Sequence, residues 1–231
     1  GRQSSVGVNR SLADLALDEP SESLRFLNVH YYAAGATLFG TEAQGAYEFP
    51  DKTYLGRNEH VSAYSNCTDC HSTHELEVKV EECSVCHDGV ESQEDLHAIR
   101  TSEPDYDGNG DTEEGIAGEI ETLHEKLYEA MQAYSTEVAG NTLAYESHSY
   151  PYFFNDTNGN GVADPDEAQR DNAFAGWTPR LLRAAYNYQY VAKDPGAFTH
   201  NPKYIIQVLY DNLEDLGTQV PVDMTGMVRP E

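Results

Sequence analysis

The chain has 231 residues, of which 39% are hydrophobic, and its 40 acidic against 14 basic side chains give a formal net charge of −26. This negative charge argues against nucleic acid and anionic membrane surfaces as partners, because both repel an acidic protein. The hydrophobic share is below that of most globular proteins, so the polypeptide alone is expected to form a thin core.

The N-terminal segment changes character near residue 25. Residues 1–24 are polar, and we predict a flexible N-terminal arm there, or less favourably an arm that docks on a neighbouring subunit. Residues 25–39 are far more apolar, with His30 in the middle. We expect a helix over 25–39, although Gly35 weakens this prediction.

All four cysteines lie in residues 67–87, which contain two C-x-x-C-H boxes. Two thiols one helical turn apart can reach the two vinyl groups on one porphyrin edge, and the next residue places an imidazole under the iron. The sequence therefore predicts two covalently bound c-type haems. The predicted thioether cysteines and proximal histidines are Cys67, Cys70 and His71 in the first box and Cys83, Cys86 and His87 in the second. Alternation of apolar and charged residues over 76–80 predicts a short strand between the boxes.

Two other chemistries could use the same cysteines. Four thiolates could bind a zinc ion, but such a site has no use for a histidine directly after each second cysteine. Disulfides within each C-x-x-C would form small reactive rings instead of stabilising crosslinks. Haem attachment is favoured over both.

Each iron is expected to take a second histidine as its distal ligand, which would give a lower potential than a methionine. His60 and His74 lie close to the boxes in sequence, and His30 lies in an apolar stretch where ligation would offset the cost of burial. Only two distal positions exist, so one of these three histidines should be spare.

The remaining histidines are not expected to be ligands. His124 lies among charged residues on a predicted solvent face. Capping or packing is the expected role of His97, His148 and His200. The methionines are disfavoured because all three lie far downstream of the boxes (Met131, Met224 and Met227).

Two acidic loops resemble calcium-binding loops. The stretch 156–167, DTNGNGVADPDE, matches the twelve-residue template, with Gly161 at the sharp turn. Its predicted ligands are Asp156, Asn158, Asn160, the carbonyl of Val162, Asp164 and Glu167. Calcium at this site is expected to clamp a long loop.

The stretch that begins at Asp105, DYDGNGDTEEGI, fits the same template less well. Its candidate ligands are Asp105, Asp107, Asn109 and Asp111. Position twelve is Ile116, which has no side-chain oxygen, so Glu113, Glu114 or Glu119 would have to replace it.

Three helices are predicted in the second half of the chain. Apolar residues recur every three or four positions over 115–139. Thr178 and Asn201 are each followed by a proline, which predicts helix starts at both, and Gly217 is placed to end the last helix. Residues 141–176 are predicted to form a loop.

These elements predict a mainly α fold with extensive irregular loops. We expect a haem-organised N-terminal half and a helical C-terminal half. The predicted boundaries place a dihaem segment at 25–104 and a helical region with acidic calcium-type loops at 105–231.

The paired boxes, with their continuation CHSTH, resemble multihaem c-type cytochromes. Three further stretches extend the resemblance from about residue 26 to 217: NVHYYAAGATLFGTE, DYDGNG and GWTPRLLRAAYNYQYVAKDPGAFTHNPKYIIQVLYD. The family includes secreted and surface polyhaem cytochromes, some of which form extracellular filaments. The resemblance thus implies electron transfer to a redox partner protein or an external acceptor, by a single chain or a homopolymer.

The chain starts at Gly1 and has no apolar run of about 18 residues, so we expect a processed product without a membrane span. Because thioether attachment of haem takes place outside the cytoplasm, we expect a secreted, extracellular or cell-surface protein, with the periplasm as the alternative. The competing functions are a redox enzyme, such as a peroxidase or oxyanion reductase with one open haem site, and a calcium-stabilised scaffold. No catalytic constellation is evident in the sequence.

Overall fold

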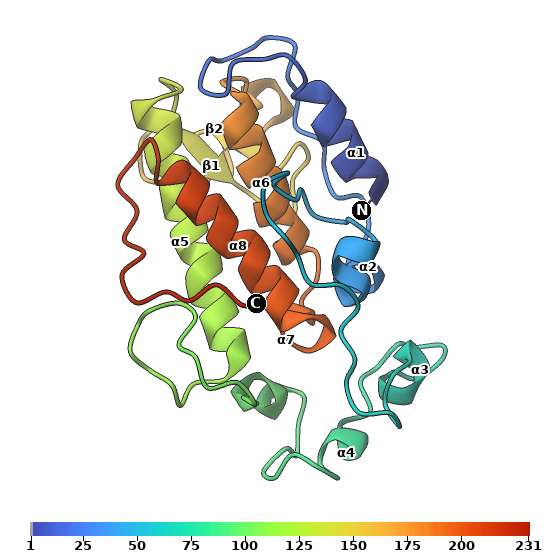
Figure 1. The fold of residues 1–231 in the computed structure, drawn as a ribbon. Coiled ribbons are helices and arrows are strands. Elements are labelled where there is room, and N and C mark those ends of the chain that lie inside the picture. The colour runs from blue at the N-terminus through green and yellow to red at the C-terminus, as the bar shows by residue number, and fades with distance from the viewer. Residues whose placement is uncertain (1) are drawn as a thin grey trace.

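The computed structural model describes residues 2–231, and three long helices form its centre (Figure 1). These are α5 (Ile116–Glu137), α6 (Pro179–Ala192) and α8 (Pro202–Leu216), which pack against one another. Their facing sides supply most of the core, including Leu123, Leu127, Met131, Leu181, Leu182, Ile205, Leu209 and Leu213. The three helices predicted from apolar periodicity and cap signals are confirmed. Within residues 2–231, none of the helices has both the length and the apolar character needed to cross a bilayer.

The starts of α6 and α8 follow the predicted cap signals. The Thr178 hydroxyl accepts a hydrogen bond from the Leu181 amide over 3.1 Å, and the Asn201 side chain accepts one from the Tyr204 amide over 3.3 Å. A proline follows each cap in the first turn, where its missing N–H is not needed. Gly217 ends α8 as predicted.

Shorter elements surround these helices. They are α1 (Arg2–Ser11), α2 (Ala34–Phe39), η1 (Gly40–Glu42), α3 (Cys67–Cys70), α4 (Val80–Cys83), η2 (Glu94–Ala98), η3 (Arg170–Asn172) and α7 (Ala197–His200). Strands β1 (Leu143–Tyr145) and β2 (Phe153–Asn155) form an antiparallel ribbon in which Ala144 lies opposite Phe154. The ribbon lies within 141–176, where the sequence predicts only loop, because three-residue strands are too short to show a periodicity.

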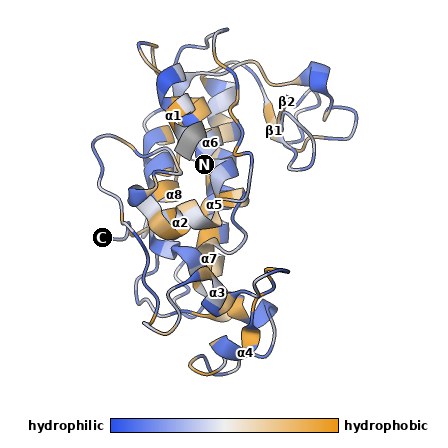
Figure 2. Ribbon diagram, turned by 90° about the vertical axis from the view of Figure 1, so that its right-hand side faces the viewer, coloured by the Kyte–Doolittle hydropathy of each residue, from blue (hydrophilic) through white to orange (hydrophobic). Residues whose placement is uncertain are grey.

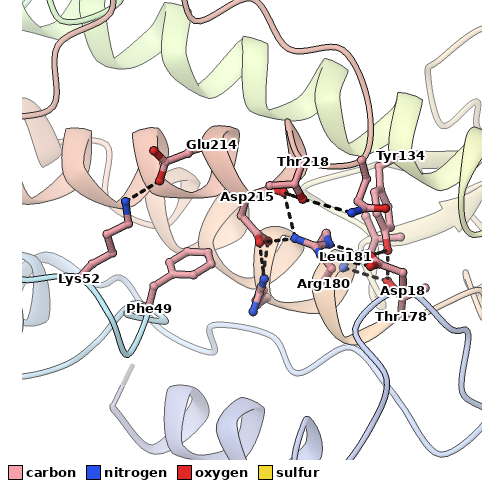
Figure 3. A network of polar contacts seen from close by, with 12 residues as sticks. Asp18, Phe49, Lys52, Tyr134, Thr178, Arg180, Leu181, Glu214, Asp215 and Thr218 are labelled. Carbon is pink, nitrogen blue, oxygen red and sulfur yellow. Dashed lines mark hydrogen bonds and ion pairs between the residues drawn. The ribbon is translucent and has the colours of Figure 1, made fainter.

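Within the predicted flexible arm, the described residues 2–24 are joined to the helices at several points. Helix α1 lies along α6, and Val8 is fully buried in the main core. Farther along, the carboxylate of Asp18 accepts a hydrogen bond from the Tyr134 hydroxyl over 2.7 Å and pairs with Arg180 over 2.6 Å (Figure 3). Arg180 also pairs with Asp215 of α8. This part of the arm therefore joins α5, α6 and α8 through one polar network.

The helix predicted over 25–39 is wrong for most of its length, because only Ala34–Phe39 is helical. The Val29 amide donates to the Gln189 side chain over 2.8 Å, and the Ala33 amide donates to the Lys193 carbonyl over 2.9 Å. The backbone before α2 is thus hydrogen-bonded to α6 and the turn after it. As a result His30 lies exposed on the surface.

The main core is shared by both halves of the chain. Leu24, Val29, Tyr47 and Phe49 join the same cluster as the residues of α5, α6 and α8. By contrast, none of residues 61–89 is buried, and this segment, with α3 and α4, lies beyond the end of the long helices in both views (Figures 1 and 2). We call residues 61–89 the cysteine lobe and the rest of the packed chain the helical body.

Candidate functional site

Each C-x-x-C-H box in the cysteine lobe is built on a single helical turn. In the first, the His71 amide donates to the Cys67 carbonyl over 2.8 Å, and in the second the His87 amide donates to the Cys83 carbonyl over 3.0 Å. Side chains three positions apart in such a turn lie on the same side. The two sulfurs of each box are therefore presented together, and all four thiols are free.

Backbone hydrogen bonds fold the two boxes against each other. The Lys79 amide donates to the Cys70 carbonyl over 2.8 Å, and the Ser72 amide donates to the Glu77 carbonyl over 2.8 Å. The strand predicted over 76–80 is wrong: the ladder is reduced to one bridge between His71 and Val78, and Val80 already begins α4.

The thiol geometry differs from that of the competing sites. Within residues 2–231, no three cysteine sulfurs lie within 4.8 Å of one another, whereas a tetrathiolate zinc site needs four converging sulfurs. Burial raises the pKa of the Cys70 and Cys83 thiols, which keeps them protonated at neutral pH. A thiol–disulfide catalyst needs a lowered thiol pKa instead. Paired thiols on one turn fit haem attachment better than either alternative.

Each box histidine faces a second imidazole. The ring centroids of His87 and His60 lie 6.2 Å apart, and those of His71 and His200 also lie 6.2 Å apart. Two imidazoles on opposite sides of one metal ion, with metal–nitrogen bonds of about 2 Å, place their ring centroids about 6 Å apart. Both separations fit that arrangement.

Hydrogen bonds at Nδ1 orient the rings of the first pair. Nδ1 of His71 lies 2.9 Å from the Leu76 carbonyl oxygen, and Nδ1 of His200 lies 2.8 Å from a carboxylate oxygen of Asp194. When Nδ1 donates its proton in this way, Nε2 keeps the lone pair that a metal ion would accept.

The other candidate histidines lie elsewhere. His30 is exposed and packs edge-on against Tyr31, with ring centroids 4.5 Å apart, and His74 is exposed in the turn after the first box. The structure brings His60 beside His87 of the second box but places neither His30 nor His74 beside a box imidazole. The ring of His97 packs on Phe198, and exposed His148 lies 3.0 Å from Glu146. His200, predicted only to cap or pack, is the candidate that the sequence reasoning missed.

The prediction that His124 lies on a solvent face is wrong. Its ring stacks on the Tyr188 ring at a centroid distance of 4.0 Å, and Nε2 lies 2.8 Å from the Tyr188 carbonyl oxygen. Burial disfavours the charged ring and lowers the pKa of His124 to about 4, although the hydrogen bond opposes this shift.

This lowered pKa predicts a pH dependence of stability. The unfolded ring has a pKa near 6.5, so the contribution of neutral His124 is complete above pH 6.5 and is lost as the pH falls toward 4. We expect the free energy of unfolding to fall by about 2–3 kcal/mol from this group across that window. Urea unfolding at a series of pH values gives the free energy of unfolding as a function of pH. This free energy should fall less steeply toward pH 4 in His124→Gln than in the wild type, whereas exposed His148→Gln should match the wild type. Equal slopes in all three proteins would contradict the assignment.

The two acidic loops share one hydrogen-bond scheme. Asp156 accepts from the Gly159 amide over 2.7 Å with one oxygen and from the Gly161 amide over 2.8 Å with the other. Asp105 makes the equivalent bonds, over 2.7 Å and 2.8 Å, to the amides of Gly108 and of residue 110. The aspartate at position one of the calcium template therefore makes the same backbone hydrogen bonds in both loops.

In each loop, one glutamate accepts hydrogen bonds from the backbone amides that follow the first aspartate, and we call it the closing carboxylate. Glu167 accepts hydrogen bonds from the amides of residues 157 and 158, over 2.7 Å and 3.2 Å. Glu119 accepts hydrogen bonds from the amides of residues 106 and 107, each over 2.8 Å. Carboxylate oxygens of Asp105, Asp107 and Glu119 lie within 4.8 Å of one another. Of the three glutamates proposed to replace Ile116, Glu119 is the one that accepts these backbone amides with one oxygen, while its other oxygen pairs with Arg100 over 2.6 Å.

The remaining predicted calcium ligands lie within the loops. The side-chain amides of Asn158 and Asn160 donate to Asp164 over 2.7 Å and 2.9 Å, and Val162 is exposed beside them. In the other loop, the Asn109 side chain donates to Asp107 over 3.0 Å, and Asp111 accepts from the backbone that follows it.

The chain is similar in sequence to C-type polyheme cytochromes. It is 26% identical over 235 residues to the C-type polyheme cytochrome OmcC of Geobacter sulfurreducens, a match that covers 86% of this chain and 27% of that protein. It is also 26% identical over 235 residues to OmcB of the same species, with 86% of this chain and 28% of OmcB covered. The chain thus spans little more than a quarter of these relatives. No family model and no solved structure matches it.

Proposed function

We propose that this chain transfers electrons through two covalently attached c-type haems with bis-histidine ligation. The observation that carries the proposal is that the histidine of each C-x-x-C-H box faces a second imidazole at a centroid distance of 6.2 Å. Bound haem supplies a one-electron Fe³⁺/Fe²⁺ couple. The relation to polyhaem cytochromes supports the same function.

All four proposed haem-binding residues of the second site lie in or next to the cysteine lobe. Cys83 and Cys86 would form the thioether bonds, His87 would be the proximal ligand and His60 the distal ligand. A pocket of about 330 Å³ opens beside Cys86 and His87, and its lining includes Val90, Ile99 and Arg100. The apolar side chains suit a porphyrin face, whereas the Arg100 guanidinium pairs with Glu119 over 2.6 Å.

Electron transfer is favoured over catalysis because both box histidines already face a second imidazole. A peroxidase or reductase needs an iron with an open or displaceable position. In the haem-loaded protein, we expect a low-potential reductant to reduce both haems and an external ferric chelate to reoxidise them. The reduced native protein should not bind carbon monoxide. Stoichiometric carbon monoxide binding would support the enzyme alternative, and haems that cannot be reduced would support the scaffold.

The partner and the site of action follow from the haem chemistry and the charge. Thioether attachment outside the cytoplasm supports a secreted, extracellular or cell-surface location, with the periplasm as the alternative. The net charge of −26 suits a basic redox partner. Filament formation stays a prediction of the family resemblance, and light scattering of the haem-loaded protein would test it. The exposed rings of His30, Tyr31 and Tyr32 form a surface where such contacts could be sought.

We also propose that both acidic loops bind calcium and thereby stabilise the helical body. The Asp156 loop matches the whole template, and the Asp105 loop reproduces its hydrogen bonds with Glu119 as the closing carboxylate. Glu119 lies in α5, so a calcium ion there would join the loop directly to a core helix. Carboxylate and carbonyl oxygens are the ligands that calcium prefers.

Removing calcium should therefore lower the melting temperature without bleaching the haem spectrum. Saturation at a hundred times the dissociation constant contributes about 2.7 kcal/mol per site. Melting of the haem-loaded protein in calcium and in a chelator measures the difference. Glu119→Gln should reduce this difference, whereas Glu121→Gln, exposed on the same helix, should preserve it. Identical melting curves with and without calcium would contradict the proposal.

A further inference from the structure

We infer that His200, oriented by Asp194, is the distal ligand of the haem attached to the first box. This inference rests on the proposed function and adds a residue of the helical body to that site. The ring of His200 lies 6.2 Å from that of His71, centroid to centroid. His200 ends α7, between α6 and α8, whereas His71 belongs to the cysteine lobe.

The contacts of Asp194 give His200 the environment of a metal-bound histidine. The carboxylate of Asp194 is 1% exposed, and its two oxygens lie 2.8 Å and 3.0 Å from Nδ1 of His200. Histidine ligands commonly donate one ring N–H to a carboxylate or a backbone carbonyl, which fixes the ring and leaves the other nitrogen for the metal. His71 has the matching bond to the Leu76 carbonyl.

The backbone around His200 is fixed on both sides. A side chain at Gly196 would come within 2.8 Å of the His200 ring, so glycine leaves room for this ring orientation. Asn201 begins α8 as its N-cap. The side-chain amide of Asn58 donates to the His200 carbonyl over 3.0 Å, which fastens the chain entering the cysteine lobe to α7.

A surface ion pair between His200 and Asp194 is the simpler reading of the same bond. Two observations favour ligation over it. The carboxylate is buried in the helical body, and the centroid of the largely covered His200 ring lies 6.2 Å from that of a C-x-x-C-H box imidazole. Both other candidates for the first haem, His30 and His74, are exposed and lie beside no box imidazole in residues 2–231.

If His200 binds this iron, the first haem connects the cysteine lobe to the helical body. Its thioether bonds and His71 belong to the lobe, whereas its distal ligand belongs to α7. The second haem differs, because His60 and His87 both lie within or next to the lobe. Loss of His200 should therefore leave an open coordination position on the iron of the first haem and leave the second haem unchanged.

The test compares haem-loaded His200→Ala with His74→Ala and His30→Ala. Mass spectrometry should find two haems in all four proteins, including the wild type. Electron paramagnetic resonance should show half of the haem as high-spin in His200→Ala alone. That variant should bind one carbon monoxide per chain when reduced, and added imidazole should restore the low-spin signal.

A fully low-spin His200→Ala protein with two haems would overturn the inference and leave the proposed function standing. A wild-type protein without covalent haem would overturn the proposed function itself. If His200→Ala does not fold, the reduction potentials of His200→Met test the inference instead, because a methionine ligand should raise the potential of one haem only. Unchanged potentials in His200→Met would overturn the inference. Asp194→Asn should shift the potential of that same haem, as expected for a positioning residue.

Discussion

Replacing Cys67 and Cys70 together with serine is expected to halve the haem content of the chain. The first box then has no sulfur to form thioether bonds, while the second box keeps Cys83 and Cys86. Mass spectrometry of the denatured protein, which retains only covalent haem, should detect one haem instead of two. Absorbance per polypeptide should fall by the same factor.

The matched control is serine at Cys83 and Cys86, which should also leave one haem. The two variants should differ in spectrum and potential because they keep haems with different surroundings. The comparison also distinguishes haem from zinc. A single zinc ion bound by four thiolates would be lost completely in either variant, because each pair of cysteines supplies half of its ligands. Loss of all bound metal in both variants would contradict the two-haem account.

Replacing Arg180 with methionine is expected to lower the free energy of unfolding by about 2–3 kcal/mol. The change leaves Asp18 without its cation, whereas Asp215 keeps its ion pair with Arg183. The Arg180 side chain is 7% exposed and pairs with both Asp18 and Asp215 (Figure 3). Urea unfolding measures the change. Exposed Arg170→Met is the control and should stay within about 0.5 kcal/mol of the wild type. Equal losses in both variants would contradict the role of the network.

The same network predicts an acid dependence. The hydrogen bond from Arg180 holds the pKa of Asp18 below its ordinary value of 3.8, although burial opposes the shift. A carboxylate with a lowered folded pKa stabilises the protein above its unfolded pKa, and this contribution is lost as the pH falls through the folded value. Arg180→Met should therefore lose less stability on acidification than the wild type.

Local sequence signals predicted the helical body well. Each of α5, α6 and α8 combines a regular apolar stripe with a nearby start or stop signal, so local and tertiary preferences agree. The calcium template in 156–167 is also local, and Asp156 and Glu167 each accept backbone hydrogen bonds from within that loop.

The features that the sequence did not reveal depend on contacts between distant segments. The backbone before α2 is not helical, and its Val29 and Ala33 amides donate to Gln189 and to the Lys193 carbonyl. His124 is desolvated by Tyr188, on a different helix. His200 faces His71 only because α7 packs near the lobe, and Glu119 closes the Asp105 loop from inside α5. Spacing along the chain contains no sign of the first three contacts, and it offers Glu119 only as one of three possible replacements for Ile116.

The intact mass and visible spectrum of the purified protein test the central claim most directly. We expect the mass of the polypeptide plus two haems, retained after denaturation, and the spectrum of six-coordinate low-spin iron. A colourless protein with the mass of the bare polypeptide, or one that holds zinc on its cysteines, would contradict the account.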